Sequence, residues 1–227
     1  MAVRLTIDGR EIEVPEGTMI LEAARMLGIE IPTLCFHEAL KPYGACRLCV
    51  VEVRAGAARG GTLVASCVFP VRDGLEVHTS SDDVKGVRRG LIELLLARCP
   101  ESRQIRALAE RFGVAESPYR PRDHLCILCG LCVRACDEIV GARAIDFFSR
   151  GQSLDVKPPL LNPSAACIAC GTCTTVCPTE AVRLEEIARV PHEHPVLEGR
   201  PAERCRVCGH HPATAVFPES YESWFKE

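Results

Sequence analysis

The feature that most constrains this chain is a pair of cysteine runs between residues 126 and 177. Each run has the spacing C-x₂-C-x₂-C-x₃-C, and a gap of thirty residues separates them. The first run reads CILCGLCVRAC and the second reads CIACGTCTTVC, with Pro178 directly after its last cysteine. Four thiols packed so closely along a chain are typical ligands of a metal ion or a metal cluster.

The spacing of the two runs predicts two [4Fe–4S] clusters, because in paired runs of this type the fourth cysteine of each run ligates the other cluster. The predicted ligands of the first cluster are Cys126, Cys129, Cys132 and Cys177, and those of the second are Cys136, Cys167, Cys170 and Cys173. Two zinc sites are the alternative, although zinc signatures usually pair C-x₂-C with more distant ligands.

A further group of four cysteines lies nearer the N-terminus, with the spacing C-x₁₀-C-x₂-C-x₁₇-C. The group comprises Cys35, Cys46, Cys49 and Cys67. Four thiolates on a long loop predict a [2Fe–2S] cluster, although the first gap is longer than in the plant-type C-x₄-C spacing. Gly44 would let the backbone approach this cluster closely, and nearby N–H groups would bond its sulfurs. Four buried cysteines without a cluster are the alternative.

The segments around these cysteines predict a small module of strands and one helix over residues 1–79. Four segments are expected to form its strands, namely Val3–Asp8, Glu11–Val14, Val50–Val53 and Leu75–Val77. Asp8-Gly9 favours a type I′ turn between the first two. Thr18 is expected to cap a helix that ends at Gly28. A hairpin, a helix and then a cysteine-rich loop indicate a β-grasp ferredoxin fold.

Residues 80–121 predict a helical connector. Its first helix starts at Ser80-Ser81 and stops at Cys99-Pro100, and a second helix over about 101–112 ends at Gly113. The expected apolar face of the first helix comprises Val84, Val87, Leu91, Leu94 and Leu95. The Arg88-Arg89 pair is expected on a solvated surface or in a partner contact.

Residues 122–186 form the predicted double-cluster module, and residues 187–227 form a tail that contains another C-x₂-C. In the gap between the two runs, Ala144–Phe148 and Leu154–Val156 are expected to pair as a hairpin, and the gap is expected to contact a partner. The predicted fold class is therefore α+β. It comprises an N-terminal β-grasp [2Fe–2S] domain, a helical connector, a bacterial-type 2[4Fe–4S] ferredoxin domain and a metal-binding tail.

The cysteine count and the net charge exclude several classes of protein. The 15 cysteines of this 227-residue chain are odd in number, and twelve fall in the cluster patterns, which argues against a disulfide scaffold. The N-terminal sequence MAVRLTIDGR lacks the apolar core of a secretory signal, so a reducing cytoplasm is expected. No apolar run is long enough to span a bilayer. A net charge of −3 argues against nucleic-acid binding.

Aromatic residues make up only 5% of the chain, although large side chains normally build much of a core of this size. Bound clusters are expected to replace part of that core. Metal binding would then be coupled to folding, and the metal-free chain is expected to be poorly folded.

Two stretches resemble a known family of iron–sulfur subunits. The stretch CFHEALKPYGACRLC, from Cys35 to Cys49, resembles the N-terminal [2Fe–2S] domain of the iron–sulfur-rich large subunit of respiratory complex I. It is similar also to the small diaphorase subunit of NAD-reducing hydrogenases, and to iron–sulfur domains of NAD-dependent formate dehydrogenases and [FeFe] hydrogenases. The stretch from Cys126 to Glu138 resembles the double-cluster domain of the same family.

This resemblance covers about residues 1–185 and implies a chain that carries electrons. The implied partners are a flavin-containing NAD(P)H-binding subunit and a terminal redox subunit such as a hydrogenase or a formate dehydrogenase. One departure concerns the middle of the chain, where the family usually has a further cluster held by H-x₃-C-x₂-C-x₅-C. Here Cys99 stands in the place of the histidine and the three following cysteines are absent, so that cluster cannot form in the family's manner.

Three cysteines remain outside the clear patterns, namely Cys99, Cys205 and Cys208. We hypothesise that they hold one zinc or iron–sulfur centre, with His210 or His211 as the fourth ligand. A buried Cys99 and a separate zinc knuckle, completed by both histidines, are the alternatives.

An electron-transfer subunit is the leading functional prediction, because three centres in one small chain suit a relay. The chain contains no G-x-G-x-x-G or Walker motif, so NADH oxidation is expected in another subunit. The alternatives are a catalytic role through an unusual cluster at Cys99 and the tail, and a free ferredoxin-like carrier or docking scaffold.

Overall fold

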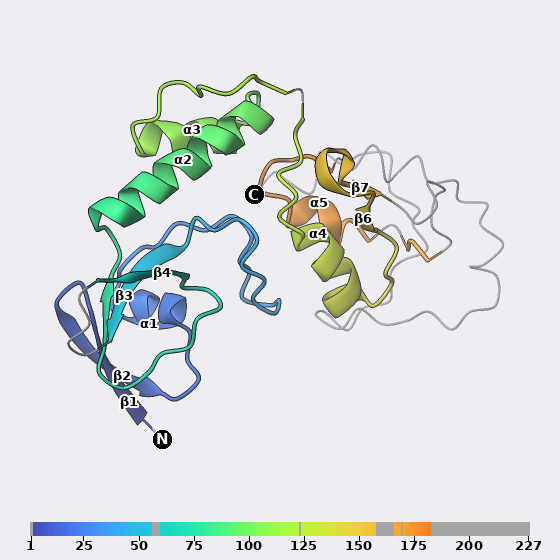
Figure 1. Ribbon diagram of the computed structural model, residues 1–227. Helices are drawn as coiled ribbons and strands as arrows, with labels where there is room; N and C mark the ends of the chain where they lie inside the picture. The colour runs from blue at the N-terminus through green and yellow to red at the C-terminus, as the bar shows by residue number, and fades with distance from the viewer. Residues whose placement is uncertain (1, 56–59, 123, 158–165, 169, 183–227) are drawn as a thin grey trace, which may run out of the picture. The chain divides into compact units, whose positions relative to one another are not determined.

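The computed structural model describes residues 2–55, 60–122, 124–157, 166–168 and 170–182 of the chain (Figure 1). It divides into two units, the first ending at Cys129 and the second starting at Gly130. In the described part, no helix combines the length and the apolar character needed to cross a membrane.

The first unit is built on a mixed sheet of five strands in the order β2-β1-β5-β3-β4 (Figure 1). The strands are β1 (Ala2–Ile7), β2 (Arg10–Pro15), β3 (Val50–Ala55), β4 (Thr62–Ala65) and β5 (Leu75–His78). β1 and β5 run parallel, and the other neighbours are antiparallel. The predicted β1–β2 hairpin is confirmed. Asp8 and Gly9 have φ values of 48° and 79°, as a type I′ turn requires.

The helix α1 (Ile20–Met26) follows the hairpin, but its predicted N-cap is wrong. Met19 is the N-cap, and its N–H donates to the Glu22 carboxylate at 3.1 Å. The Thr18 hydroxyl instead donates to a main-chain carbonyl of the preceding turn at 2.7 Å. Gly28, with φ of 72°, follows the helix as predicted.

The core between α1 and the sheet reaches two of the predicted cluster ligands. Cys49 and Cys67 are buried in the same apolar cluster as residues of β1, α1, β3 and β5. The fully buried aliphatic members of this cluster are Ile7, Ile20, Leu21, Val51 and Val77. Two of the four cysteines predicted to bind a [2Fe–2S] cluster, Cys49 and Cys67, are therefore anchored in the core beside the sheet.

A second apolar core joins the cysteine-rich loop to the helices α2 (Asp82–Arg98) and α3 (Arg103–Arg111). Its buried members are Leu34, Leu48, Ile92, Cys99, Ile105, Ala109 and Val114. The loop contributes Leu34 and Leu48, so the two helices share a core with the predicted cluster-binding loop.

The buried face of α2 differs from the predicted one. Leu94 is 51% exposed and Val87 is 38% exposed, although both were expected in the apolar stripe. Val84, Arg88 and Ile92 are buried instead, at intervals of four residues. The expectation that Arg88 lies on a solvated surface is therefore wrong.

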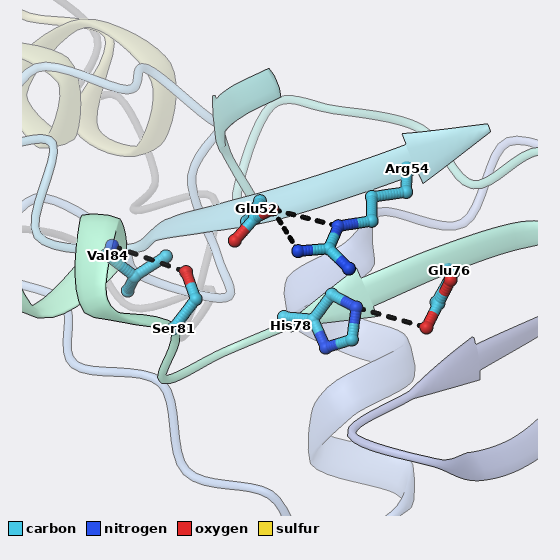
Figure 2. Close-up of polar contacts among 6 residues, drawn as sticks. All are labelled: Glu52, Arg54, Glu76, His78, Ser81 and Val84. Atoms are coloured by element: carbon cyan, nitrogen blue, oxygen red, sulfur yellow. Dashed lines mark hydrogen bonds and ion pairs between the residues drawn. The ribbon is translucent and has the colours of Figure 1, made fainter. Parts of the chain in front are cut away.

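Three pairs of polar contacts lie near the start of α2 and the strands β3 and β5 (Figure 2). Ser81 is the N-cap, and its hydroxyl oxygen accepts from the Val84 N–H at 3.4 Å. Glu52 is buried on β3 and accepts from Arg54 at 2.9 Å. Hydrogen bonds from Ser81 and then Arg54 lower the pKa of the Glu52 carboxyl. The charged carboxylate therefore links β3 to the beginning of the helix.

The second unit is made of short elements. The described ones are α4 (Leu131–Arg134), the π-helix η1 (Ala135–Val140), β6 (Asp146–Phe148), the 3₁₀ helix η2 (Gly151–Ser153), β7 (Asp155–Lys157) and α5 (Thr172–Thr175). β6 and β7 pair antiparallel, which confirms the predicted hairpin in the gap between the cysteine runs.

Candidate metal-cluster sites

The four N-terminal cysteines lie in two contacting pairs. Cys35, Cys49 and Cys67 are each 1% exposed, and Cys46 is half-buried. The sulfur atoms of Cys49 and Cys67 are 3.3 Å apart, and the Cys46 N–H donates to the Cys35 sulfur at 3.4 Å. The structure thus brings each cysteine of the C-x₂-C pair beside one of the two more distant cysteines.

The ionisation of these thiols is mutually coupled. The hydrogen bond with Cys67 lowers the pKa of Cys49 to about 6, against the effect of burial. The same bond and burial raise the pKa of Cys67, and the hydrogen bond with Cys35 and burial raise the pKa of Cys46. A charge on Cys35 raises the pKa of all three others. Four such thiolates coexist only when a cation neutralises them, and iron would do so.

Gly44 allows two parts of this site to pack closely. It has φ of 70°, in the left-handed region that favours glycine. A Cβ at this position would lie 3.3 Å from the side chain of Val68, the residue after Cys67. A larger residue at this position would therefore push the loop that carries Cys46 away from the segment that carries Cys67.

In the second unit, four predicted ligands line one small cavity. They are Cys136, Cys167, Cys170 and Cys173, the set predicted to share a [4Fe–4S] cluster. The rest of the lining is mainly apolar, with Val140, Ala144, Ile145 and Ile168. Cys170 is exposed and the other three cysteines are half-buried, so the lining suits a cluster that is partly shielded from water.

Cys136 and Cys173 resist ionisation in the absence of metal. Burial raises the pKa of Cys173 to about 12, and the charges of Cys170, Cys167 and Cys136 add to this effect. Burial also raises the pKa of Cys136. Binding of iron would release these protons, so the donor set fits a cationic cluster core.

The two cysteine runs have the same local backbone. Gly130 and Gly171 directly follow the second cysteine of their runs and have φ values of 73° and 71°. Each glycine is the N-cap of a four-residue helix, α4 or α5, that carries the third cysteine, Cys132 or Cys173. The left-handed glycine turns the chain sharply, so that consecutive cysteines can face one centre.

Main-chain N–H groups donate to several cysteine sulfurs. Leu128 donates to Cys126 at 3.4 Å, Ala144 to Cys136 at 3.2 Å and Ala181 to Cys177 at 3.2 Å. Such bonds stabilise negative charge on sulfur and are one means by which a protein tunes a cluster's reduction potential.

The boundary between the two units falls inside the first cysteine run, between Cys129 and Gly130. The grouping of Cys126, Cys129, Cys132 and Cys177 around one cluster therefore stays a prediction from their spacing. Arg98, in the last turn of α2, donates from Nε to the Cys126 carbonyl at 2.6 Å. This contact anchors the start of the run to the helix.

Cys99 is fully buried at 0% exposure, among Ile92, Ile105 and Ala109 in the second apolar core. The residues predicted to share a metal with it, namely Cys205, Cys208, His210 and His211, lie outside the described residues. Within the described residues, no three His, Cys, Asp or Glu side chains are gathered as ligands of a single metal ion.

Two family models match the chain. Residues 1–82 match a 2Fe-2S iron-sulfur cluster binding domain, and residues 125–181 match a 4Fe-4S dicluster domain. Together they cover both groups of predicted cluster cysteines.

Several curated proteins are similar to most of the chain. NADPH-Fe(3+) oxidoreductase subunit alpha from Geobacter sulfurreducens is 37% identical over 78% of the chain. NADP-reducing hydrogenase subunit HndD from Solidesulfovibrio fructosivorans is 36% identical over 78%, and an NADH-quinone oxidoreductase subunit from Rhizobium meliloti is 30% identical over 92%. The chain spans 23%, 35% and 26% of these three proteins, respectively.

One solved structure is similar to most of the chain. A chain of an NAD⁺-reducing [NiFe]-hydrogenase, crystallised in the H₂-reduced state, aligns with a TM-score of 0.66 and 32% identity. The alignment covers 79% of the present chain and 86% of that chain.

Proposed function

Because this chain belongs to the family of iron–sulfur electron-transfer subunits that occur in NAD(P)-linked hydrogenases and NADH-quinone oxidoreductases, we propose that it relays electrons between a flavin-containing NAD(P)H-binding subunit and a second redox subunit. The second subunit would be a hydrogenase, a formate dehydrogenase or a similar enzyme. Free thiols suited to iron would place this complex in the reducing cytoplasm.

The observation that carries this proposal is the paired arrangement of buried thiols. Cys35, Cys46, Cys49 and Cys67 would hold one [2Fe–2S] cluster in a β-grasp domain, and the cavity lined by Cys136, Cys167, Cys170 and Cys173 would hold a [4Fe–4S] cluster. Cys126, Cys129, Cys132 and Cys177 would hold a second [4Fe–4S] cluster. Iron–sulfur clusters, when bound, supply one-electron transfer.

The residues of the chain set the conditions for this transfer. Burial of Cys35, Cys49 and Cys67 excludes water from the first site, and N–H bonds to Cys136 and Cys177 stabilise charge at the others. No side chain here is required to make or break a bond of a substrate. The relay function therefore needs donor and acceptor groups on other subunits.

The cluster inventory predicts the metal content of the complex isolated anaerobically from its native source. We expect this chain to contribute about ten irons, from one [2Fe–2S] and two [4Fe–4S] clusters, in addition to any iron of its partner subunits. Electron paramagnetic resonance after stepwise reduction is expected to show one [2Fe–2S] and two [4Fe–4S] signals, and flavin is expected in a co-purifying subunit.

Three outcomes of this experiment would contradict the proposal. A complex without flavin, or a chain that purifies alone and exchanges electrons freely, would favour a free ferredoxin-like carrier. Absence of a [2Fe–2S] signal would remove the assignment of Cys35, Cys46, Cys49 and Cys67.

The extra metal centre is tested by comparing Cys99→Ser with Cys205→Ser. If Cys99 shares a metal with Cys205, Cys208 and one of His210 and His211, both variants lose the same zinc or iron. The burial of Cys99 among aliphatic side chains favours the other outcome, in which only Cys205→Ser loses metal. Elemental analysis of zinc and iron, with the wild-type chain as control, distinguishes the two.

A further inference from the structure

Arg88 is a buried cation in the middle of α2, with 6% exposure. Val84 lies one turn before it and Ile92 one turn after it, and both are fully buried. The next residue, Arg89, is different, because its side chain is 66% exposed and pairs with Glu93 at 3.2 Å. Two neighbouring arginines of equal charge therefore occupy opposite environments.

The Arg88 guanidinium makes three hydrogen bonds, all to main-chain carbonyls. Nε donates to Leu48 at 3.1 Å, Nη2 to Val50 at 2.7 Å and Nη1 to Thr79 at 2.9 Å. Leu48 lies between Cys46 and Cys49, Val50 begins β3, and Thr79 follows β5. One side chain of α2 is thus hydrogen-bonded to the C-x₂-C segment, to the start of β3 and to the residue after β5.

These three acceptors are neutral, so they leave the positive charge uncompensated. Burial lowers the pKa of Arg88, and the negative charges of Cys49 and then Asp8 act against this effect. A buried charge is costly unless an opposite charge lies nearby. The thiolate site would supply more negative charge than Cys49 alone, because a [2Fe–2S] cluster with four thiolate ligands is a net anion.

We propose that Arg88 is a positioning residue of the [2Fe–2S] site and the cation that compensates its charge. The guanidinium holds the carbonyl of Leu48, and the N–H of Cys49 points to the other side of the same planar peptide. Arg88 therefore sets the orientation of a peptide next to a ligand. Reduction adds one negative charge to the cluster, so a desolvated cation beside it favours the reduced form and raises the reduction potential.

This inference rests on the proposed assignment of the N-terminal cysteines to a [2Fe–2S] cluster. It extends the site beyond residues 1–82, which match the cluster-binding domain, into the connector helix. The cluster site would then be complete only when α2 is docked.

The test compares Arg88→Met, Arg88→Lys and the matched control Arg89→Met in the full chain purified anaerobically. Redox titration followed by electron paramagnetic resonance measures the potential and g-values of the [2Fe–2S] cluster, and release of iron to a chelator measures its retention. Arg88→Met is expected to lower the reduced-to-oxidised ratio at the wild-type midpoint at least tenfold, a shift of about 59 mV for one electron. Arg89→Met is expected to leave the potential, g-values and release rate unchanged.

Arg88→Lys separates charge from geometry. The ammonium keeps the charge but lacks the planar fork that serves three carbonyls. For Arg88→Lys we expect the reduced-to-oxidised ratio of the cluster, at the wild-type midpoint potential, to lie within about threefold of the wild-type ratio. We also expect faster release of iron. If Arg88→Met yields no folded chain, the proposal is tested by Arg88→Lys. Faster iron release from this variant supports the proposal, and iron release at the wild-type rate overturns it. A folded Arg88→Met with wild-type potential and g-values would overturn the role of Arg88 alone, whereas a wild-type chain without a [2Fe–2S] signal would overturn the cluster assignment as well.

Discussion

Removal of iron from the purified chain is expected to unfold the second unit while the sheet of the first unit stays folded. The second unit relies on four-residue helices, α4 and α5, and on three-residue strands, β6 and β7. Helices this short are not stable alone in water, and a single two-stranded hairpin is marginal. Its thiols repel one another when charged, so the bound cluster supplies the stabilising contacts.

The first unit has a different source of stability. Both apolar cores of the described residues lie in it, one between α1 and the sheet and one between the cysteine-rich loop, α2 and α3. Full burial of each large aliphatic side chain contributes about 1.5–3 kcal/mol. We therefore revise the expectation that the whole metal-free chain is poorly folded, and restrict it to the second unit.

Hydrogen exchange followed by mass spectrometry measures this difference directly. After anaerobic chelation, peptides from 131–157 and 166–182 are expected to lose protection by at least about a hundredfold, because structural metal sites contribute many kcal/mol. Peptides of β1, β5 and α2 are expected to keep most of theirs. Retained protection in the second unit, or equal loss in both units, would contradict this account.

Leu48→Ala is expected to destabilise the first unit by about 2–5 kcal/mol. Leu48 is 0% exposed and inserts from the cluster-binding loop into the core that contains Ile92 and Ile105. Its truncation leaves a cavity between the loop and the two helices, and the surrounding residues relax only partially into such a cavity. The loop that carries Cys46 and Cys49 would also lose its anchor, so we expect faster loss of the [2Fe–2S] cluster.

Urea unfolding of the wild-type and variant chains under anaerobic conditions measures the effect. With a slope of about 2 kcal/mol per molar, the midpoint is expected to fall by about 1–2.5 M. Leu63→Ala is the matched control, because Leu63 is 39% exposed on β4 and its truncation is expected to change stability by at most about 0.5 kcal/mol. Equal midpoints for the two variants would show that Leu48 does not couple the loop to the helices.

The local elements of this chain could be predicted where short-range signals agree. The Asp8-Gly9 turn, the limits of α2 and the hairpin between the cysteine runs all follow from neighbouring residues. The N-cap of α1 could not be predicted in this way, because Thr18 and Met19 are adjacent candidates for this position. In the structure, the Glu22 carboxylate accepts from the Met19 N–H, so Met19 is the N-cap. The grouping of Cys136 with Cys167, Cys170 and Cys173 was visible in the spacing alone.

Arg88 shows why the contacts between α2 and the cysteine-rich loop could not be predicted from the sequence. Its place between Val84 and Ile92 was a usable signal, since positions four apart share one helix face. Against this signal, charged side chains are rarely buried without a partner. The partners are carbonyls of Leu48, Val50 and Thr79, which no pattern of side chains reveals.

The sequence alone predicts iron–sulfur chemistry, because the spacing of the cysteines is typical of cluster ligands, and the matches to a 2Fe-2S domain and a 4Fe-4S dicluster domain agree with it. It also determined the strands and helices whose signals lie within a few residues. The tertiary structure was needed to show that the loop bearing Cys46 and Cys49 shares an apolar core with α2 and α3. It was also needed to show that Arg88 donates a hydrogen bond to the Leu48 carbonyl of this loop. Such contacts join residues about forty positions apart. They also use neutral main-chain carbonyls, which every residue has, so the pattern of side chains cannot predict them.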